Sequence, residues 1–235
     1  MDAELDQLID ALLSDRAYAS GRRRFPRTVT MEQALEMVKI AHEQIDVGTA
    51  ARQKSADRDG VVIACKAGCN GCCEELILVL SPEAELVARW LQRPENAAIK
   101  AGFLERYPAW RERIGDGAER LIAFVVARDS EGQLEQHKAQ WRKRILCAFN
   151  HEGLCTIYPV RPTVCRNGHA VDTAERCVGD NPGLIPATRL LYKPLDDFMA
   201  NSRQLEMAAH NAIGGTPNRP EALCEVVAKK LQQGQ

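Results

Sequence analysis

The chain has 235 residues, of which 45% are hydrophobic and 27% are charged, so it is long enough to bury a sizeable core as one folded unit. Its 31 basic and 32 acidic residues nearly cancel, which excludes the strong positive field typical of proteins that bind nucleic acid or an anionic membrane. No apolar run reaches the roughly 20 residues that span a bilayer, and the acidic start is unlike a secretory signal, so we expect a cytoplasmic protein with no nucleic-acid or membrane partner.

The spacing of apolar residues predicts a mainly α fold with little or no sheet. Apolar side chains recur every three or four positions over residues 4–19 and again over 30–45, which predicts two N-terminal helices. The Ser-Pro-Glu sequence at 81–83 is typical of a helix start in which the serine hydroxyl caps the first amides, and Pro94 should end that helix.

Further along the chain, the same spacing predicts helices over residues 109–128 and 134–145, with a turn between them at 129–132. Two closing helices are expected over 195–213 and 221–231. One segment, Glu-Leu-Ile-Leu-Val-Leu at residues 75–80, is a plausible strand, although a buried helical turn fits it almost as well.

Residues 146–190 cannot form long helices, because they contain four prolines, four glycines and four cysteines. A stretch of this length inside a compact domain needs something to organise it, and a bound metal would do so. We therefore expect one compact unit over 1–235, with N-terminal helices over 1–60, a cysteine-cluster core with inserted helices over 61–180, and C-terminal helices over 181–235.

The cysteines are concentrated in a way that indicates a metal centre, since four of the nine fall within nine consecutive positions. Thiolates are soft, charged donors that bind zinc and iron tightly, and Gly68 and Gly71 allow a turn that brings neighbouring sulfurs together. A disulfide framework is the weaker interpretation, because the count is odd and adjacent Cys72 and Cys73 could pair only through a strained bridge. The candidate ligands are Cys65, Cys69, Cys72, Cys73, Cys147, Cys155, Cys165 and Cys177.

Within this set, Cys69 and Cys72 form a Cys-x-x-Cys knuckle whose two sulfurs can bind one metal. Cys73 could bridge to a second metal, bind another iron of a cluster, or pack as a thiol. Eight thiols are enough for two four-thiolate centres, or for one cluster with spare thiols. Cys224, among apolar residues near the end of the chain, is expected to pack in the core instead.

Four other side chains lie close to these cysteines in the sequence. Arg161 and Arg166 are placed either to compensate the charge of a buried thiolate centre and tune its sulfurs, or to hydrogen-bond the carbonyls of their own loop. His151 and His169 could each replace a cysteine as ligand, although histidines in loops are usually solvated.

Two stretches of the sequence resemble a known family. Cys-Lys-Ala-Gly-Cys-Asn-Gly-Cys-Cys at 65–73 and Cys-Thr-Ile-Tyr-Pro-Val-Arg-Pro-Thr-Val-Cys-Arg at 155–166 resemble the YkgJ-type, CxxCxxCC cysteine-cluster family, described as zinc- or iron-chelating proteins and related to flagellin lysine N-methylase. The resemblance covers residues 60–185 and implies a zinc or iron centre. One departure concerns Cys65, which is followed by a gap of three residues where the family name implies two.

Thiolates suit both metals, but the crowding of cysteines and the absence of paired Cys-x-x-Cys knuckles favour an iron–sulfur cluster of the 4Fe-4S type over zinc. The chain has none of the standard nucleotide-binding or hydrolase motifs. Three functions stay open: a binding or metal-handling protein with a protein partner, an S-adenosylmethionine-dependent protein lysine methyltransferase as the resemblance implies, and a redox or electron-transfer protein. The first is preferred, because it requires only what the residues show.

Overall fold

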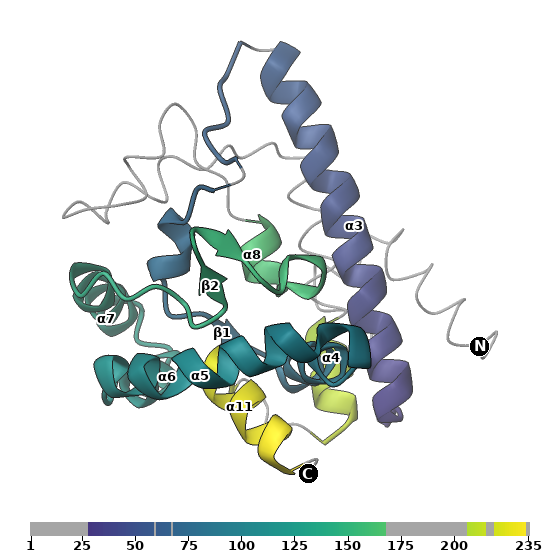
Figure 1. The fold of residues 1–235 in the computed structure, drawn as a ribbon. Coiled ribbons are helices and arrows are strands. Elements are labelled where there is room, and N and C mark those ends of the chain that lie inside the picture. Colours follow the sequence, from purple (N-terminus) through teal and green to yellow (C-terminus); the bar gives the residue numbers. More distant parts are fainter. Residues whose placement is uncertain (1–27, 59, 67, 168–205, 215–218, 234–235) are drawn as a thin grey trace.

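A computed structural model of the chain describes residues 28–58, 60–66, 68–167, 206–214 and 219–233 (Figure 1). The helix predicted over 4–19 and the candidate ligands Cys177 and His169 lie outside these residues, as does most of the helix predicted over 195–213. None of the described helices is long and apolar enough to cross a membrane.

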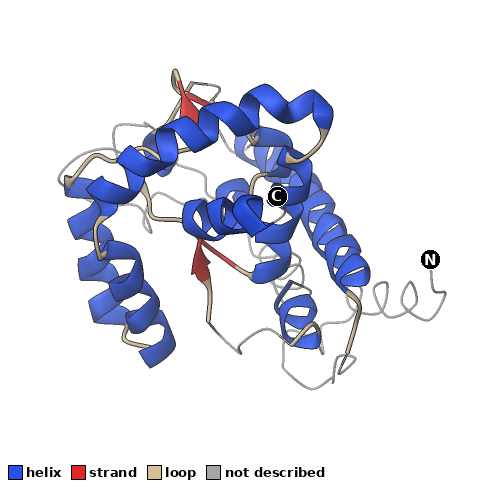
Figure 2. Ribbon diagram, turned by 60° about the horizontal axis from the view of Figure 1, so that its bottom comes forward, coloured by secondary structure: helices blue, strands red, loops and turns tan. Residues whose placement is uncertain are grey.

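Helices make up most of the described structure, as the apolar spacing predicts, and the strands are short (Figure 2). Residues 206–212 are also helical, within the first of the two predicted closing helices. The α-helices are α3 (Met31–Arg58), α4 (Ser81–Leu91), α5 (Ala97–Ile114), α6 (Gly117–Ala127), α7 (Ser130–Arg142), α8 (Thr163–Asn167) and α11 (Leu223–Gln233). Short 3-10 helices are η1 (Gly71–Glu74), η2 (Pro94–Asn96) and η3 (Tyr158–Val160).

Sheet structure in the described residues is limited to two antiparallel pairs of two-residue strands. β1 (Leu78–Val79), within the predicted strand, pairs with β4 (Glu221–Ala222) just before α11. β2 (Asn150–His151) and β3 (Leu154–Cys155) form a hairpin inside the segment predicted to be irregular, and Asn150 lies opposite Cys155. The chain reverses at Glu152 and Gly153, which both have positive φ angles.

The main hydrophobic core lies where α4, α5 and α11 meet β1 and the β2–β3 hairpin. Phe103 of α5 and Phe149 at the start of the hairpin are both fully buried, and their rings stack with centroids 4.1 Å apart. Because Cys147, Cys155 and Cys165 pack against this core, the core fixes where their segments lie.

The start of α4 differs from the prediction. The helix begins at Ser81 with Leu80 as the capping residue, and the carboxylate of Glu83 accepts a hydrogen bond from the Leu80 amide at 3.3 Å. The expected hydroxyl cap at Ser81 is therefore wrong, because the third helical residue satisfies the amide instead. The predicted end is confirmed, since α4 stops at Leu91 and η2 begins at Pro94.

The single helix predicted over 109–128 is wrong, because the chain breaks at Gly115. Its φ angle of 61° and ψ angle of −131° end α5, and α6 starts two residues later. The turn predicted at 129–132 is instead the first turn of α7, where Asp129 accepts a hydrogen bond from the Gly132 amide at 2.9 Å.

Candidate metal centre

The two cysteine-rich segments lie against each other in the structure. The Cys147 amide donates a hydrogen bond to the Cys73 carbonyl at 2.7 Å, which joins the end of the first segment to the start of the hairpin. The loops also meet at their tips, because a Cβ atom placed on Gly153 would lie 3.8 Å from the Gly68 carbonyl oxygen. Tertiary folding thus brings together segments that are far apart in the sequence, as the prediction of a shared centre requires.

The first segment is a tight turn followed by η1. The Cys69 amide donates to the Lys66 carbonyl at 3.0 Å, and Gly68 between them has a φ of 83°, a conformation that glycine adopts without strain. The Cys73 amide then donates to the Asn70 carbonyl at 2.9 Å. Cys65 and Cys72 are exposed, whereas Cys69 and Cys73 are partly buried, so the knuckle stands at the rim of the protein.

Cys72 and Cys73 differ in how readily their sulfurs ionise. A hydrogen bond between the thiol of Cys72 and the sulfur of Cys73 raises the pKa of Cys72. The same bond lowers the pKa of Cys73 to about 6, against the effect of burial and with help from the polar Asn150 side chain. Within this pair, Cys73 therefore ionises more readily than Cys72.

The negative charge of Cys73 helps to raise the pKa of three cysteines in the second segment. Burial raises the pKa of Cys155 to about 11 and raises the pKa of Cys165 well above its ordinary value, and the negative charge of Cys73 adds to both shifts. For Cys147, a hydrogen bond with Cys224 and then burial raise the pKa, and Cys73 again contributes. Four sulfurs thus lie within electrostatic reach of one another around Cys73, and a bound cation would be needed to keep all four ionised.

The cysteine sulfurs of the described residues do not converge tightly enough to surround one metal ion. Among the cysteines, histidines, aspartates and glutamates that the structure describes, no three cysteines bring their sulfurs within 4.8 Å of one another. One tetrahedral zinc ion needs such an arrangement, since it binds four thiolates directly. An iron–sulfur cluster holds its thiolates farther apart, because each of them binds a different iron. The sulfurs are the kind of soft donor that zinc and iron prefer.

Cys224 makes a contact that sequence analysis missed. It is buried in the core on α11, as predicted, but its Sγ atom lies 3.6 Å from that of Cys147. The helical pattern around Cys224 shows that it faces inward, but not which side chain it meets there.

The two arginines differ in their surroundings. Arg166 is buried and donates to the carbonyls of Arg161 at 2.8 Å and Pro159 at 2.7 Å, and its third contact is the carboxylate of Asp46 at 2.6 Å. These contacts agree with the prediction that Arg166 hydrogen-bonds the carbonyls of its own loop through its planar guanidinium group, rather than compensating the charge of the sulfurs. Arg161 instead lies over the Tyr158 ring at 3.9 Å, and its charge offsets part of the burial that raises the pKa of Cys155.

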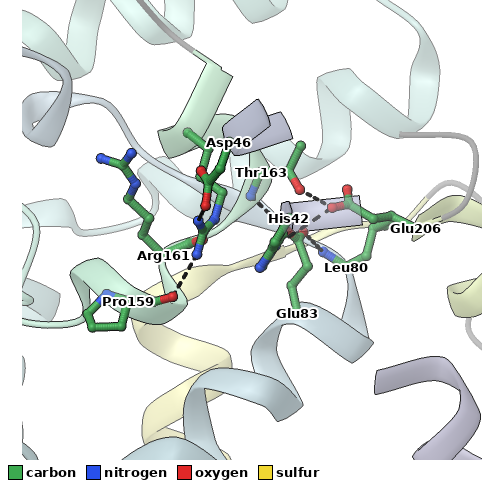
Figure 3. Close-up of polar contacts among 9 residues, drawn as sticks. His42, Asp46, Leu80, Glu83, Pro159, Arg161, Thr163 and Glu206 are labelled. Atoms are coloured by element: carbon green, nitrogen blue, oxygen red, sulfur yellow. Dashed lines mark hydrogen bonds and ion pairs between the residues drawn. The ribbon is translucent and has the colours of Figure 1, made fainter. Parts of the chain in front are cut away.

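A buried cluster of His42, Glu83 and Glu206 was not predicted from the sequence. It is the one set of described residues with three potential ligand atoms within 4.8 Å of one another. Figure 3 shows the three side chains pointing toward a common place from separate helical segments. They are separated by dozens of residues and share no motif, so spacing alone could not reveal them. His151, the described histidine considered as a replacement ligand, is exposed on β2.

Comparison with known proteins yields no relative. No protein-family model matches the chain. No curated protein and no solved structure matches it either. Assignment to the cysteine-cluster family therefore stays a prediction based on the two motifs.

Proposed function

We propose that the protein is a metal-binding cysteine-cluster protein whose two cysteine-rich segments hold an iron–sulfur cluster, and that it acts in binding a partner or handling metal. The observation that carries the proposal is the position of Cys73. Its carbonyl accepts the Cys147 amide, and its sulfur influences Cys147, Cys155 and Cys165 electrostatically. Cys65, Cys69 and Cys72 continue the same short segment.

Exposure of two of these thiols favours a binding or metal-handling role over a sealed structural site. Cys65 and Cys72 are exposed, whereas Cys147, Cys155 and Cys165 are at least partly buried against the core. A centre of this kind has a fixed inner side and an accessible outer side. An incoming thiol or a protein surface could reach the outer ligands without opening the fold.

The residues around the sulfurs would also support such a centre. The Asn150 side chain helps to lower the pKa of Cys73, and the cationic Arg161 does the same for Cys155, so both would offset the negative charge of bound thiolates. When bound, an iron–sulfur cluster would supply reversible one-electron chemistry, and zinc would supply only structure or Lewis acidity.

The deciding experiment is anaerobic purification followed by measurement of iron, zinc and acid-labile sulfide per chain, together with an absorption spectrum. Iron and sulfide in similar amounts, with a broad visible band, are the expected result. Stoichiometric zinc in a colourless protein would reject the cluster but keep the cysteine centre. A folded protein that binds neither metal would reject the proposal as a whole.

A further inference from the structure

The helical part of the protein contains a group of three potential metal ligands, separate from the cysteines. We propose that His42 of α3, Glu83 of α4 and Glu206 bind one divalent first-row cation such as Mn²⁺, Fe²⁺ or Zn²⁺. The proposal is independent of the cysteine centre, because it concerns different residues and a different class of ligand atom.

The distances between the three side chains fit a shared cation. The Nε2 atom of His42 lies 3.6 Å from the Oε1 atom of Glu83 and 3.7 Å from the Oε1 atom of Glu206 (Figure 3). Two ligand atoms that are each bound at about 2.1 Å to one metal can be at most about 4.2 Å apart. Both measured separations fall inside this limit, yet both are too long for a hydrogen bond.

Burial makes the arrangement costly without a cation. His42, Glu83 and Glu206 are only 5%, 5% and 4% exposed, and Nε2 of His42 is a buried atom with no hydrogen-bond partner. Among the described residues, no lysine or arginine forms an ion pair with Glu83. The buried carboxylate of Glu83 beside the unsatisfied imidazole nitrogen of His42 carries a desolvation cost that a divalent ion at the centre of the cluster would offset.

Neighbouring groups hold the carboxylates in place. The Thr163 amide at the start of α8 donates to Oε1 of Glu83 at 2.9 Å, and its hydroxyl donates to Oε1 of Glu206. Oε2 of Glu83 accepts the Leu80 amide. A carboxylate oxygen has two lone pairs, so the Oε1 atom of each glutamate can accept a hydrogen bond and bind a metal ion at the same time. Such outer hydrogen bonds are what orient ligands in metal sites.

The donor set indicates which metals would bind. One imidazole and two carboxylates are harder ligands than thiolates, and they suit Mn²⁺, Fe²⁺ and Zn²⁺. Three protein ligands leave at least one position for water or a substrate oxygen, as in catalytic rather than structural sites. The protein would therefore hold two chemically distinct centres, and α8 joins them, because Thr163 and Cys165 lie two residues apart on it.

Manganese is the most selective probe, because Mn²⁺ prefers oxygen and nitrogen ligands and binds thiolates poorly. The full chain, dialysed against a chelator and then against plain buffer, is titrated with Mn²⁺ while electron paramagnetic resonance measures the free ion. We expect one Mn²⁺ per chain. Substitutions Glu206→Gln and His42→Gln should each weaken binding by at least about 100-fold, since loss of outer partners alone costs about 10–100-fold.

Two control variants show whether Mn²⁺ binds at these three residues or elsewhere on the protein. Glu85→Gln, on the same helix as Glu83 but paired with Lys230, should bind Mn²⁺ like the unmodified protein. Cys155→Ala should also keep Mn²⁺ even if it loses iron, so the two proposals can fail separately. Circular dichroism confirms folding of each variant, and Glu83→Gln, which conserves volume, replaces any variant that does not fold. Absence of Mn²⁺ binding by the unmodified chain, or full binding by the Glu206 variant, would overturn the site.

Discussion

The amide of Cys147 donates a 2.7 Å hydrogen bond to the carbonyl of Cys73, across a stretch of chain that includes α4, α5, α6 and α7. This bond is formed by main-chain atoms, so it positions the two cysteine segments whatever their side chains bind. A metal held by both segments would act on an arrangement that the hydrophobic core already supports, because Cys147 packs against that core. Metal binding and the stability of the hairpin should therefore be coupled.

Three cysteine substitutions test which sulfurs bind metal. Cys69→Ala and Cys155→Ala should each lower metal content and the melting temperature, since each removes a predicted ligand from a different segment. Cys224→Ala should keep its metal, although it removes a buried side chain from the core and should cost about 1 kcal/mol of unfolding free energy. Metal analysis and thermal unfolding of the three purified variants measure both effects.

The contact between Cys224 and Cys147 makes the third variant the informative one. If Cys224→Ala loses metal as completely as Cys155→Ala, then Cys224 belongs to the centre and the assignment of the core cysteine is wrong. Equal metal loading in all three variants would contradict the cysteine centre itself.

Substitution of Arg166 tests whether this arginine holds its own loop in place or acts on the cysteine sulfurs. Arg166→Lys keeps the charge but removes the planar fork that reaches two carbonyls and Asp46. Loss of these charge-assisted bonds should cost about 2–3 kcal/mol of unfolding free energy, measured by chemical denaturation, while metal content and absorption spectrum stay unchanged.

A matched control for that substitution is Arg161→Lys. Lysine keeps a cation over the Tyr158 ring, so the cost in stability should be below about 1 kcal/mol. A shifted spectrum or lost metal in Arg166→Lys, with little change in stability, would instead mean that Arg166 acts on the metal centre.

Local signals in the sequence predicted much of the helical framework. The helix predicted over 30–45 corresponds to the first part of α3, and Pro94 follows the end of α4, because periodicity and proline act on the nearest turns. The break at Gly115 was missed, since the apolar pattern continues on both sides of it and outweighs one glycine. Which helices pack together is decided by contacts distant in sequence, and periodicity carries no information about them.

The two candidate sites also differ in how far local sequence signals reveal them. The cysteines are conspicuous in the composition, and their chemistry alone predicts that Cys147, Cys155 and Cys165 should be brought to the first cysteine segment by folding. His42, Glu83 and Glu206 each look ordinary in their own helices, and nothing in the sequence around Glu83 shows that its side chain both caps α4 and faces His42. Only the packing of α3 and α8 against neighbouring helices reveals that the three side chains converge.

Glu85 links α4 to α11 and should give stability that depends on pH. Burial of Glu85 opposes its ionisation, but hydrogen bonds from Lys230 and Arg89 outweigh that effect and lower its pKa below the ordinary value of 4.5. A carboxyl with a lowered pKa in the folded state stabilises the protein above the unfolded pKa and loses this effect as the pH falls through the folded pKa. Glu85→Gln should therefore cost about 1 kcal/mol at pH 7, a modest value because its partners are partly exposed.

The measurement is the difference in unfolding free energy between the unmodified protein and Glu85→Gln, followed from pH 7 downward. This difference should shrink below about pH 4.5, and any acid effect on the cysteine centre cancels because both proteins share it. Glu135→Gln is the control, since its ion pair with Lys138 lies in solvent and should contribute nothing measurable. If the difference in unfolding free energy between the two proteins stays constant with pH, the charge of Glu85 does not stabilise the fold. The cost of Glu85→Gln would then come from lost packing or hydrogen bonds, which do not depend on the ionisation of Glu85.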